Sequence, residues 1–141
     1  MGSALKIEAL EFARGANVSV LATGSGAKRV NARVMQIVKV DDDFTVWYST
    51  YGASDKISEL KNDPRTCVIM SNYKVMTDLR FHGTTEIITD QKTKDRLWQD
   101  EWTRYYPKGK TDPNYTILKF TPGEVEFRNM NKYGMEAKKL K

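Results

Sequence analysis

The most informative segment of the chain reads RVNARVMQIVKVDDDFTVWYST and spans residues 29–50. Its two halves, 29–40 and 44–50, are rich in β-branched and aromatic residues, which is typical of strands. Between them, the aspartates Asp41 to Asp43 indicate a turn. We therefore expect two consecutive antiparallel strands that pair across a tight turn.

Similar runs continue on both sides of this hairpin. They predict strands at 17–23, 65–72, 78–89, 115–120 and 124–129. Helical spacing predicts helices at 4–14, 55–62 and 91–102, and turn residues predict loops at 24–28, 105–114 and 121–123. Gly83 interrupts one of the strands, which indicates a bulge or a sharp bend.

These elements point to a mainly β fold. Six or seven antiparallel strands with two or three helices at the joints exclude a doubly wound fold, in which a helix follows each strand. Strand-rich chains of this size remove their exposed edges by closing into a barrel. We expect one domain over residues 1–141: a small antiparallel β-barrel with peripheral helices at about 5–128, and a basic tail at about 129–141.

The composition is that of an ordinary globular protein, with 40% hydrophobic and 29% charged residues in a chain of 141. No apolar run approaches the roughly 18 residues that a membrane span needs. The first residues, MGSALKIEALEF, lack the apolar core of a signal peptide. We therefore expect a cytoplasmic protein without a membrane partner.

The formal net charge of +5 raises the question of nucleic-acid binding. From Arg128 onward, five basic residues accompany one acidic residue, so this tail carries +4. Nucleic-acid sites typically combine a basic stripe with exposed aromatic residues, and no such stripe is evident. We expect a solvated or frayed tail and no nucleic-acid partner.

Residues for metal binding or nucleophilic catalysis are scarce. Cys67 is the only cysteine and His82 the only histidine, which leaves a zinc site incomplete. Cys67 lies in the apolar run TCVIM and is expected to be an inert core residue. His82 is expected to be a core or surface histidine rather than part of a catalytic triad. The sequence thus predicts no metal site and identifies no catalytic residue.

The segment WYSTYGASDKISELKNDP, residues 47–64, places hydroxyl groups on both sides of a strand-to-helix turn. Ser49 and Thr50 end the strand, Ser54 precedes the helix, and Lys56 lies in its first turn. Backbone N–H groups at a helix start, with hydroxyls and a lysine around them, can bind an anion. The competing explanation is an ordinary helix cap at Ser54 with a solvated lysine, and caps are common.

Arg33 is unusual because it lies in the middle of an apolar strand. A half-buried arginine needs a partner anion. That partner can be a protein carboxylate, or it can be the same anion that Ser54 and Lys56 would bind. Since the two strands of the hairpin are consecutive, Arg33 and Thr50 can lie close together. A single phosphate would then account for both features.

Several short motifs follow one another along the chain. They are NARVM at 31–35, WYST at 47–50, SDK at 54–56, NDPRTCVIM at 62–70, FHGTTEIITD at 81–90, LWQDEW at 97–102 and YYPKGKTDPNYTILKFTPGEVEF at 105–127. In this order they resemble the flavin-binding split-barrel proteins related to pyridoxamine 5'-phosphate oxidase, and within that group the branch called general stress protein 26. The resemblance covers about residues 5–128 and is specific as a combination.

The resemblance implies a split β-barrel that binds FMN as a homodimer, with two cofactors at the subunit interface. It implies that Arg33 pairs with the FMN phosphate and that the backbone at Val34 and Met35 meets the edge of the isoalloxazine. The remaining cofactor-binding residues implied by it are Ser49, Thr50, Ser54 and Lys56, around the phosphate. Trp98 and Trp102 share one face of a predicted helix. They can be core residues, or, as the resemblance favours, they can lie at the subunit interface near the flavin held by the partner.

Departures from the family pattern bear on the activity. Asp55 replaces a basic residue of the oxidases, and Val38 stands where they carry a lysine for the substrate phosphate. The terminal NKYGMEAKKLK lacks their arginine-bearing segment. The resemblance therefore implies an FMN-dependent oxidoreductase, with NADH or NADPH as candidate electron donor, that is not a true pyridoxamine phosphate oxidase. The alternatives are a non-catalytic flavin-binding stress protein, or a barrel that binds haem or a deazaflavin.

Overall fold

The computed structural model describes residues 3–24 and 29–141. Its strands are β1 (Val18–Gly24), β2 (Val30–Val40), β3 (Val46–Tyr51), β4 (Arg65–Asn72), β5 (Thr77–Ile88), β6 (Tyr115–Asn129) and β7 (Lys138–Lys139). Its helices are α1 (Ser3–Gly15), α2 (Asp55–Asn62), α3 (Gln91–Leu97) and α4 (Met130–Tyr133), with 3₁₀ helices η1 (Asp100–Arg104) and η2 (Gly109–Thr111). The loop predicted at 24–28 lies outside the described residues, except that Gly24 ends β1.

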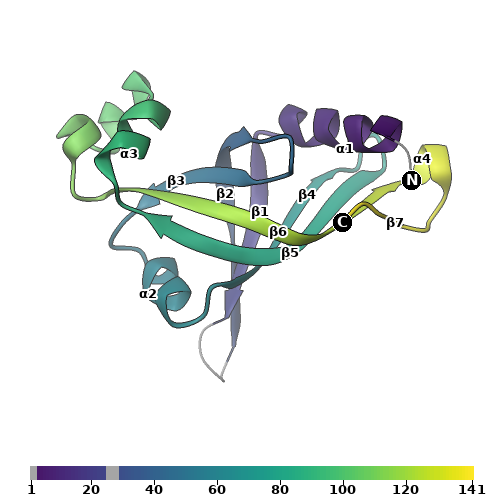
Figure 1. Ribbon diagram of the computed structural model, residues 1–141, viewed down its shortest axis with the longest axis horizontal. Coiled ribbons are helices and arrows are strands. Elements are labelled where there is room, and N and C mark those ends of the chain that lie inside the picture. The colour runs from purple at the N-terminus through teal and green to yellow at the C-terminus, as the bar shows by residue number, and fades with distance from the viewer. Residues whose placement is uncertain (1–2, 25–28) are drawn as a thin grey trace.

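Six of the strands form a closed antiparallel barrel (Figure 1). The sheet runs in the order β3-β2-β1-β4-β5-β6, and β6 also pairs with β3, which closes the circle. β6 can do this because it is long: its first residues face β3, while most of its length pairs with β5. The predicted mainly β barrel is confirmed, as is the hairpin formed by β2 and β3.

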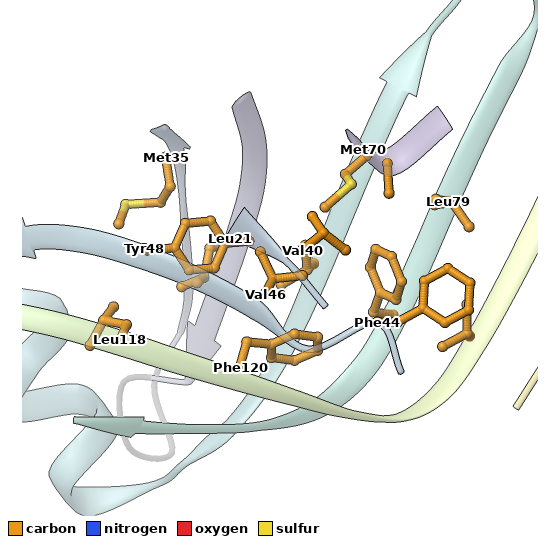
Figure 2. Close-up of a cluster of buried hydrophobic side chains, with 14 of the residues drawn as sticks. Leu21, Met35, Val40, Phe44, Val46, Tyr48, Met70, Leu79, Leu118 and Phe120 are labelled. Carbon is orange, nitrogen blue, oxygen red and sulfur yellow. The ribbon is translucent and has the colours of Figure 1, made fainter. Parts of the chain in front are cut away.

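Apolar side chains from every strand of the barrel fill its interior (Figure 2). Phe81 packs against Phe44 and Phe120, with ring centroids 6.0 and 6.1 Å apart. Met35 and Tyr48 lie at one end of this core in Figure 2. The core therefore extends to the part of β2 that carries predicted site residues.

β6 is one continuous strand, so the prediction of a turn at 121–123 is wrong. The register with β5 shifts between His82 and Gly83, and this bulge accommodates Pro122 and Gly123 inside a strand. A Cβ atom on Gly83 would clash with the carbonyl oxygen of Thr121, which explains why a glycine is needed there. The irregularity predicted at Gly83 is confirmed.

The helices lie outside the barrel, with α1 and α2 well apart in Figure 1. α1 packs Ala9 and Ala13 against the core, and α2 packs Ile57 and Leu60 against it. None of the helices in the described ranges combines the length and apolar character that a bilayer crossing requires.

The helix predicted at 91–102 is shorter than expected. α3 ends at Leu97, and Trp98 is extended, with φ −60° and ψ 141°. The break lets the rings of Trp98 and Trp102 meet edge to face with centroids 5.8 Å apart. Tertiary packing of the two indoles therefore overrides the helical spacing that the sequence indicates.

The basic tail is exposed over most of its length, which agrees with the solvated one of the two predicted alternatives. Its residues 138–139 form β7, which pairs with β6. α4 is tied to α1, because Lys132 and Tyr133 contact the carboxylate of Glu8 at 3.3 and 2.7 Å. Backbone pairing, to which a run of lysines gives no clue, holds this segment in place.

The only cysteine and histidine lie opposite each other on β4 and β5. Cys67 is half-buried, so its predicted place in the core is wrong, and burial raises the pKa of its thiol. It alternates with the inward Val68 along β4 and therefore faces away from the barrel interior. His82 is exposed, as one of the two predicted placements requires.

Candidate functional site

Arg33 lies opposite the buried Leu21 on neighbouring strands, so both side chains share the inward face of the sheet. Its Nη1 donates to the Leu21 carbonyl at 3.3 Å and to the Thr23 hydroxyl at 2.8 Å. Its Nη2 donates to Oε1 of Glu59 at 3.1 Å, which forms an ion pair. Within the described residues no hydrogen bond uses Nε, so one donor edge of the guanidinium remains for another acceptor.

Glu59 is the partner carboxylate that the sequence left as one of two alternatives. α2 buries it to 8% side-chain exposure. Its Oε2 accepts from Nδ2 of Asn31 at 2.7 Å and from the Thr23 hydroxyl at 3.4 Å. Sequence reasoning missed this residue, although it follows Lys56 by about one helical turn and therefore shares a face of α2 with it.

Lys56 brings predicted residues from the strand and the helix together. Its Nζ donates to the hydroxyls of Thr50 and Ser54, both at 2.9 Å. Ser54 immediately precedes α2, but its side chain does not cap the helix, because its hydroxyl donates to the Tyr51 carbonyl at 2.7 Å. The structure therefore does not show the simple side-chain cap that competed with an anion site. We call Arg33, Thr50, Ser54 and Lys56 the cation cluster.

The two cations of this cluster are close enough to affect each other. The pKa of Lys56 is below its ordinary value, first because burial disfavours the charged amine and then because of the charge of Arg33. Glu59 and Asp55 act in the opposite direction. An anion added between Arg33 and Lys56 would relieve this repulsion and accept charge-assisted hydrogen bonds.

A pocket of about 410 Å³ adjoins the cation cluster. Its lining comes from β2, β3 and the segment around η1, and consists of Val34, Met35, Gln36, Ser49, Thr50, Tyr51, Trp102, Tyr105 and Tyr106. Small-molecule and cofactor sites have volumes of about 300–1,000 Å³. Thr50 both lines the pocket and accepts from Lys56, so the pocket and the cation cluster meet at this residue.

Buried aromatic residues make one wall of the pocket rigid. Trp102 and Tyr106 pack around Tyr115, with ring centroids 5.8 and 5.2 Å from it. The Tyr115 hydroxyl donates to the carbonyl of Lys94 at 2.8 Å, and burial raises the pKa of Tyr115. Burial also raises the pKa of Tyr106. The wall is therefore apolar, uncharged and fixed, which suits a planar ligand.

The structure brings all but one of the predicted site residues into these two adjoining groups. Arg33, Thr50, Ser54 and Lys56 form the cation cluster, and Val34, Met35, Ser49 and again Thr50 line the pocket. Trp98 is not among the lining residues; its ring packs edge-on against Tyr115 at a centroid distance of 5.1 Å.

Three tyrosines of the pocket were not predicted. Tyr51 and Tyr105 are 51% and 60% exposed, so they stand at its rim, whereas Tyr106 is buried in its wall. Tyr51 is the last residue of β3, directly after Ser49 and Thr50, and this continuity was an available signal. Tyr105 and Tyr106 lie beyond η1 in a segment without periodic spacing, where position relative to the barrel cannot be inferred.

The lining residues offer hydroxyl, amide, thioether and aromatic groups, with no carboxylate or imidazole among them. Among residues 3–24 and 29–141, no three His, Cys, Asp or Glu side chains gather as a metal centre would require. The arrangement is suited to holding a planar apolar ligand whose anionic group reaches Arg33 and Lys56.

Comparison with known proteins identifies relatives over nearly the whole chain. The model of the family described as pyridoxamine 5'-phosphate oxidase like matches residues 6–138. General stress protein 26 of Bacillus subtilis (strain 168) is 25% identical over 91 residues, which are 62% of this chain and 64% of that protein. The chain's match thus spans about 64% of the length of this curated relative.

Solved structures show the same fold. A Clostridium acetobutylicum protein related to general stress protein 26, of the pyridoxinephosphate oxidase family, has a TM-score of 0.87 and 26% identity, covering 100% of this chain and 96% of that one. The general stress FMN/FAD binding protein of Xanthomonas citri has a TM-score of 0.75 and 22% identity, with 96% of each chain covered. At the latter identity the likeness concerns the fold.

Proposed function

The chain belongs to the pyridoxamine 5'-phosphate oxidase-like family, and from this premise we propose that it binds FMN and acts as an FMN-dependent oxidoreductase. The observation that carries the proposal is the junction at Thr50, where the cation cluster meets the apolar pocket. FMN has two matching parts, a phosphate and a planar ring system. The Xanthomonas citri relative is named as an FMN/FAD binding protein, which supports a flavin as the ligand class.

The residues present fit this cofactor in charge and in shape. The phosphate would accept hydrogen bonds from the Nε edge of Arg33 and from Lys56, beside the hydroxyls of Thr50 and Ser54. Its negative charge would raise the pKa of Lys56 toward the ordinary value, reversing the effect of burial. The ring system would occupy the pocket between Val34 and Met35 of β2 and its aromatic wall.

FMN supplies the redox chemistry of its isoalloxazine ring when it is bound. The chain's own contribution is to bind the phosphate, to orient the ring and to keep water away from it. Trp102 and Tyr106 exclude water on one side, because both are buried. We propose NADH or NADPH as the electron donor, since hydride transfer needs no acid or base from a pocket that offers none.

Val38 separates this protein from the vitamin-oxidising members of the family. It stands where the oxidases carry a lysine for the substrate phosphate, and here it packs against the cluster around Trp47 and Trp102. An apolar side chain at this place cannot recognise a phosphate. We therefore propose a substrate other than pyridoxamine 5'-phosphate.

We further propose a homodimer that completes the site. Val20 pairs with Val34 on one side and with Ile69 on the other, and these three side chains are 36%, 66% and 40% exposed. We call them the outer apolar face. Val34 belongs both to this face and to the pocket, so a second copy packed there would stand beside the bound ring. An isologous interface would form the site twice.

A visible spectrum of the protein after addition of FMN tests the proposed ligand. We expect one FMN per chain, the absorption of a bound flavin, and quenching of tryptophan fluorescence, because Trp102 lines the pocket. A Soret-type band in the protein as purified would point to haem instead, and the absence of any flavin binding would contradict the proposal. Anaerobic addition of NADH or NADPH then separates an oxidoreductase, whose flavin is reduced, from a non-catalytic flavin-binding protein.

Arg33→Ala is expected to weaken FMN binding about a hundredfold, and Lys56→Ala about fivefold. Arg33 is 22% exposed, and its planar guanidinium can bind a phosphate through two N–H groups at once, whereas Lys56, at the start of α2, carries a compact point charge without that planar geometry. Isothermal titration of the apoproteins measures both effects. Arg33→Lys is the matched control for charge, because it keeps a counter-ion for Glu59 but loses the planar donor edge. A larger effect of Lys56→Ala would show that the roles of the two cations are reversed.

A further inference from the structure

Glu59 is a buried charged residue to which the proposed function assigns no role. It pairs at 3.1 Å with the same guanidinium that we assign to the phosphate. Its second oxygen accepts from Nδ2 of Asn31 at 2.7 Å, so both oxygens of the carboxylate are hydrogen-bonded. The protein therefore already holds an anion beside the place where the anion of the cofactor would bind.

The formal charges around this place balance without any ligand. Arg33 and Lys56 are positive, and Glu59 and Asp55 are negative. Asp55 is exposed and its field is screened by solvent, whereas Glu59 is buried and its field is screened much less. Glu59 therefore provides most of the negative potential that an incoming phosphate meets.

The contacts of Arg33 show which groups hold its guanidinium in place and which group balances its charge. Its Nη1 is held by two uncharged acceptors, the Leu21 carbonyl at 3.3 Å and the Thr23 hydroxyl at 2.8 Å. These bonds fix the guanidinium against β1 without help from Glu59. The single bond to Glu59 therefore adds mainly an opposite charge, and it uses one N–H group that a phosphate could otherwise engage.

We propose that Glu59 is a specificity-determining residue, which limits how strongly the cation cluster prefers a flavin with a phosphate over one without. It acts as an internal counter-ion of Arg33, so the phosphate shares an existing ion pair instead of neutralising an unpaired cation. The inference rests on the proposed function. Because riboflavin lacks the phosphate, its affinity does not depend on this charge.

The physical basis is the state of Arg33 before the ligand arrives. Loss of the carboxylate leaves a half-buried cation without its partner, which destabilises the ligand-free protein. A bound phosphate restores the missing negative charge, so its binding free energy is more favourable in a variant without the carboxylate than in the wild type. It also escapes the short-range repulsion by Glu59, which is strong where water is scarce.

Glu59→Gln tests this, because it removes the charge while keeping the shape and an acceptor oxygen. We expect the dissociation constant for FMN to fall about tenfold and that for riboflavin to stay unchanged, measured by titration of the apoprotein followed by flavin fluorescence. Glu11→Gln makes the same charge change on α1, well away from α2 in Figure 1, and should alter neither constant. An FMN affinity in Glu59→Gln equal to or weaker than that of the wild type overturns the proposal.

If Glu59→Gln does not fold, Glu59→Asp takes its place. It keeps the charge but withdraws it from Arg33 by one methylene group, so a smaller gain in FMN affinity is expected, again without a change for riboflavin. An unchanged ratio of the two affinities in this variant overturns the proposal as well.

Failure of the proposed function would give a different result. A wild-type protein that binds neither flavin contradicts the flavin assignment, and inorganic phosphate then becomes the probe, because the counter-ion argument concerns the anion alone. Thermal melting in phosphate, compared with chloride at equal ionic strength, should stabilise Glu59→Gln more than the wild type. An equal or smaller stabilisation overturns the role of Glu59.

Discussion

Riboflavin is expected to bind this protein about a thousandfold more weakly than FMN. The two ligands share the ring system that fits the pocket and differ in the phosphate that fits the cation cluster. Each charge-assisted hydrogen bond contributes about 1.5–3 kcal/mol, so loss of the bonds to Arg33 and Lys56 accounts for about 4 kcal/mol. In the described part of the chain no group bonds to Nε of Arg33, which is the structural reason to expect that Glu59 and the phosphate can bind the guanidinium together.

Parallel titrations of the apoprotein with FMN and riboflavin measure this difference. Arg33→Ala is the control, because the gap between the two ligands should shrink in it while the affinity for riboflavin stays nearly the same. Equal affinities in the wild type would mean that the phosphate does not reach the cation cluster, and the assignment of Arg33 and Lys56 would then fail.

The strands and helices could be predicted where their signals are local. Alternating apolar residues and the aspartate turn specify the β2–β3 hairpin, and Ile57 and Leu60 specify the buried face of α2. The predictions are wrong where contacts with segments distant in the sequence determine the local structure. Pro122 and Gly123 have the local signature of a turn, but pairing of β6 with β5 draws them into a strand through a bulge. The break after Leu97 likewise depends on packing of Trp98 against Tyr115, which no local pattern encodes.

The candidate site likewise combines features that have a local sequence signal with one that depends on tertiary packing. A hydroxyl-rich turn and a cation in an apolar strand are visible in the sequence, and in the structure Lys56 donates hydrogen bonds to the hydroxyls of both Thr50 and Ser54. The identity of the carboxylate beside Arg33 could not be predicted, because Glu59 is distant along the chain and reaches Arg33 only through the packing of α2 on the barrel. The sequence leaves open whether the partner of Arg33 is a carboxylate or a phosphate, and the structure shows the carboxylate of Glu59.

Val20→Asp is expected to separate the proposed homodimer into monomers and to impair retention of FMN. Val20 lies at the centre of the outer apolar face, between Val34 and Ile69, so a carboxylate there would be buried by the second copy without a partner. Burial of an unpaired polar or charged group costs about 1–3 kcal/mol or more, and the isologous interface would contain the change twice. The dimer dissociation constant should therefore rise about a thousandfold, from a total of about 4 kcal/mol.

Light scattering of the wild type and the variant, with and without FMN, measures both consequences. Val75→Asp is the matched control, because Val75 is 47% exposed and lies in the turn between β4 and β5, outside the outer apolar face. It should leave the oligomeric state and FMN content unchanged. FMN retention should fall with dimer dissociation, because Val34 contributes to both the interface and the pocket, and monomers would expose the ring to water on that side. A wild-type monomer that retains one FMN per chain would show instead that a single barrel, with Tyr51 and Tyr105 at the rim, is enough to enclose the cofactor.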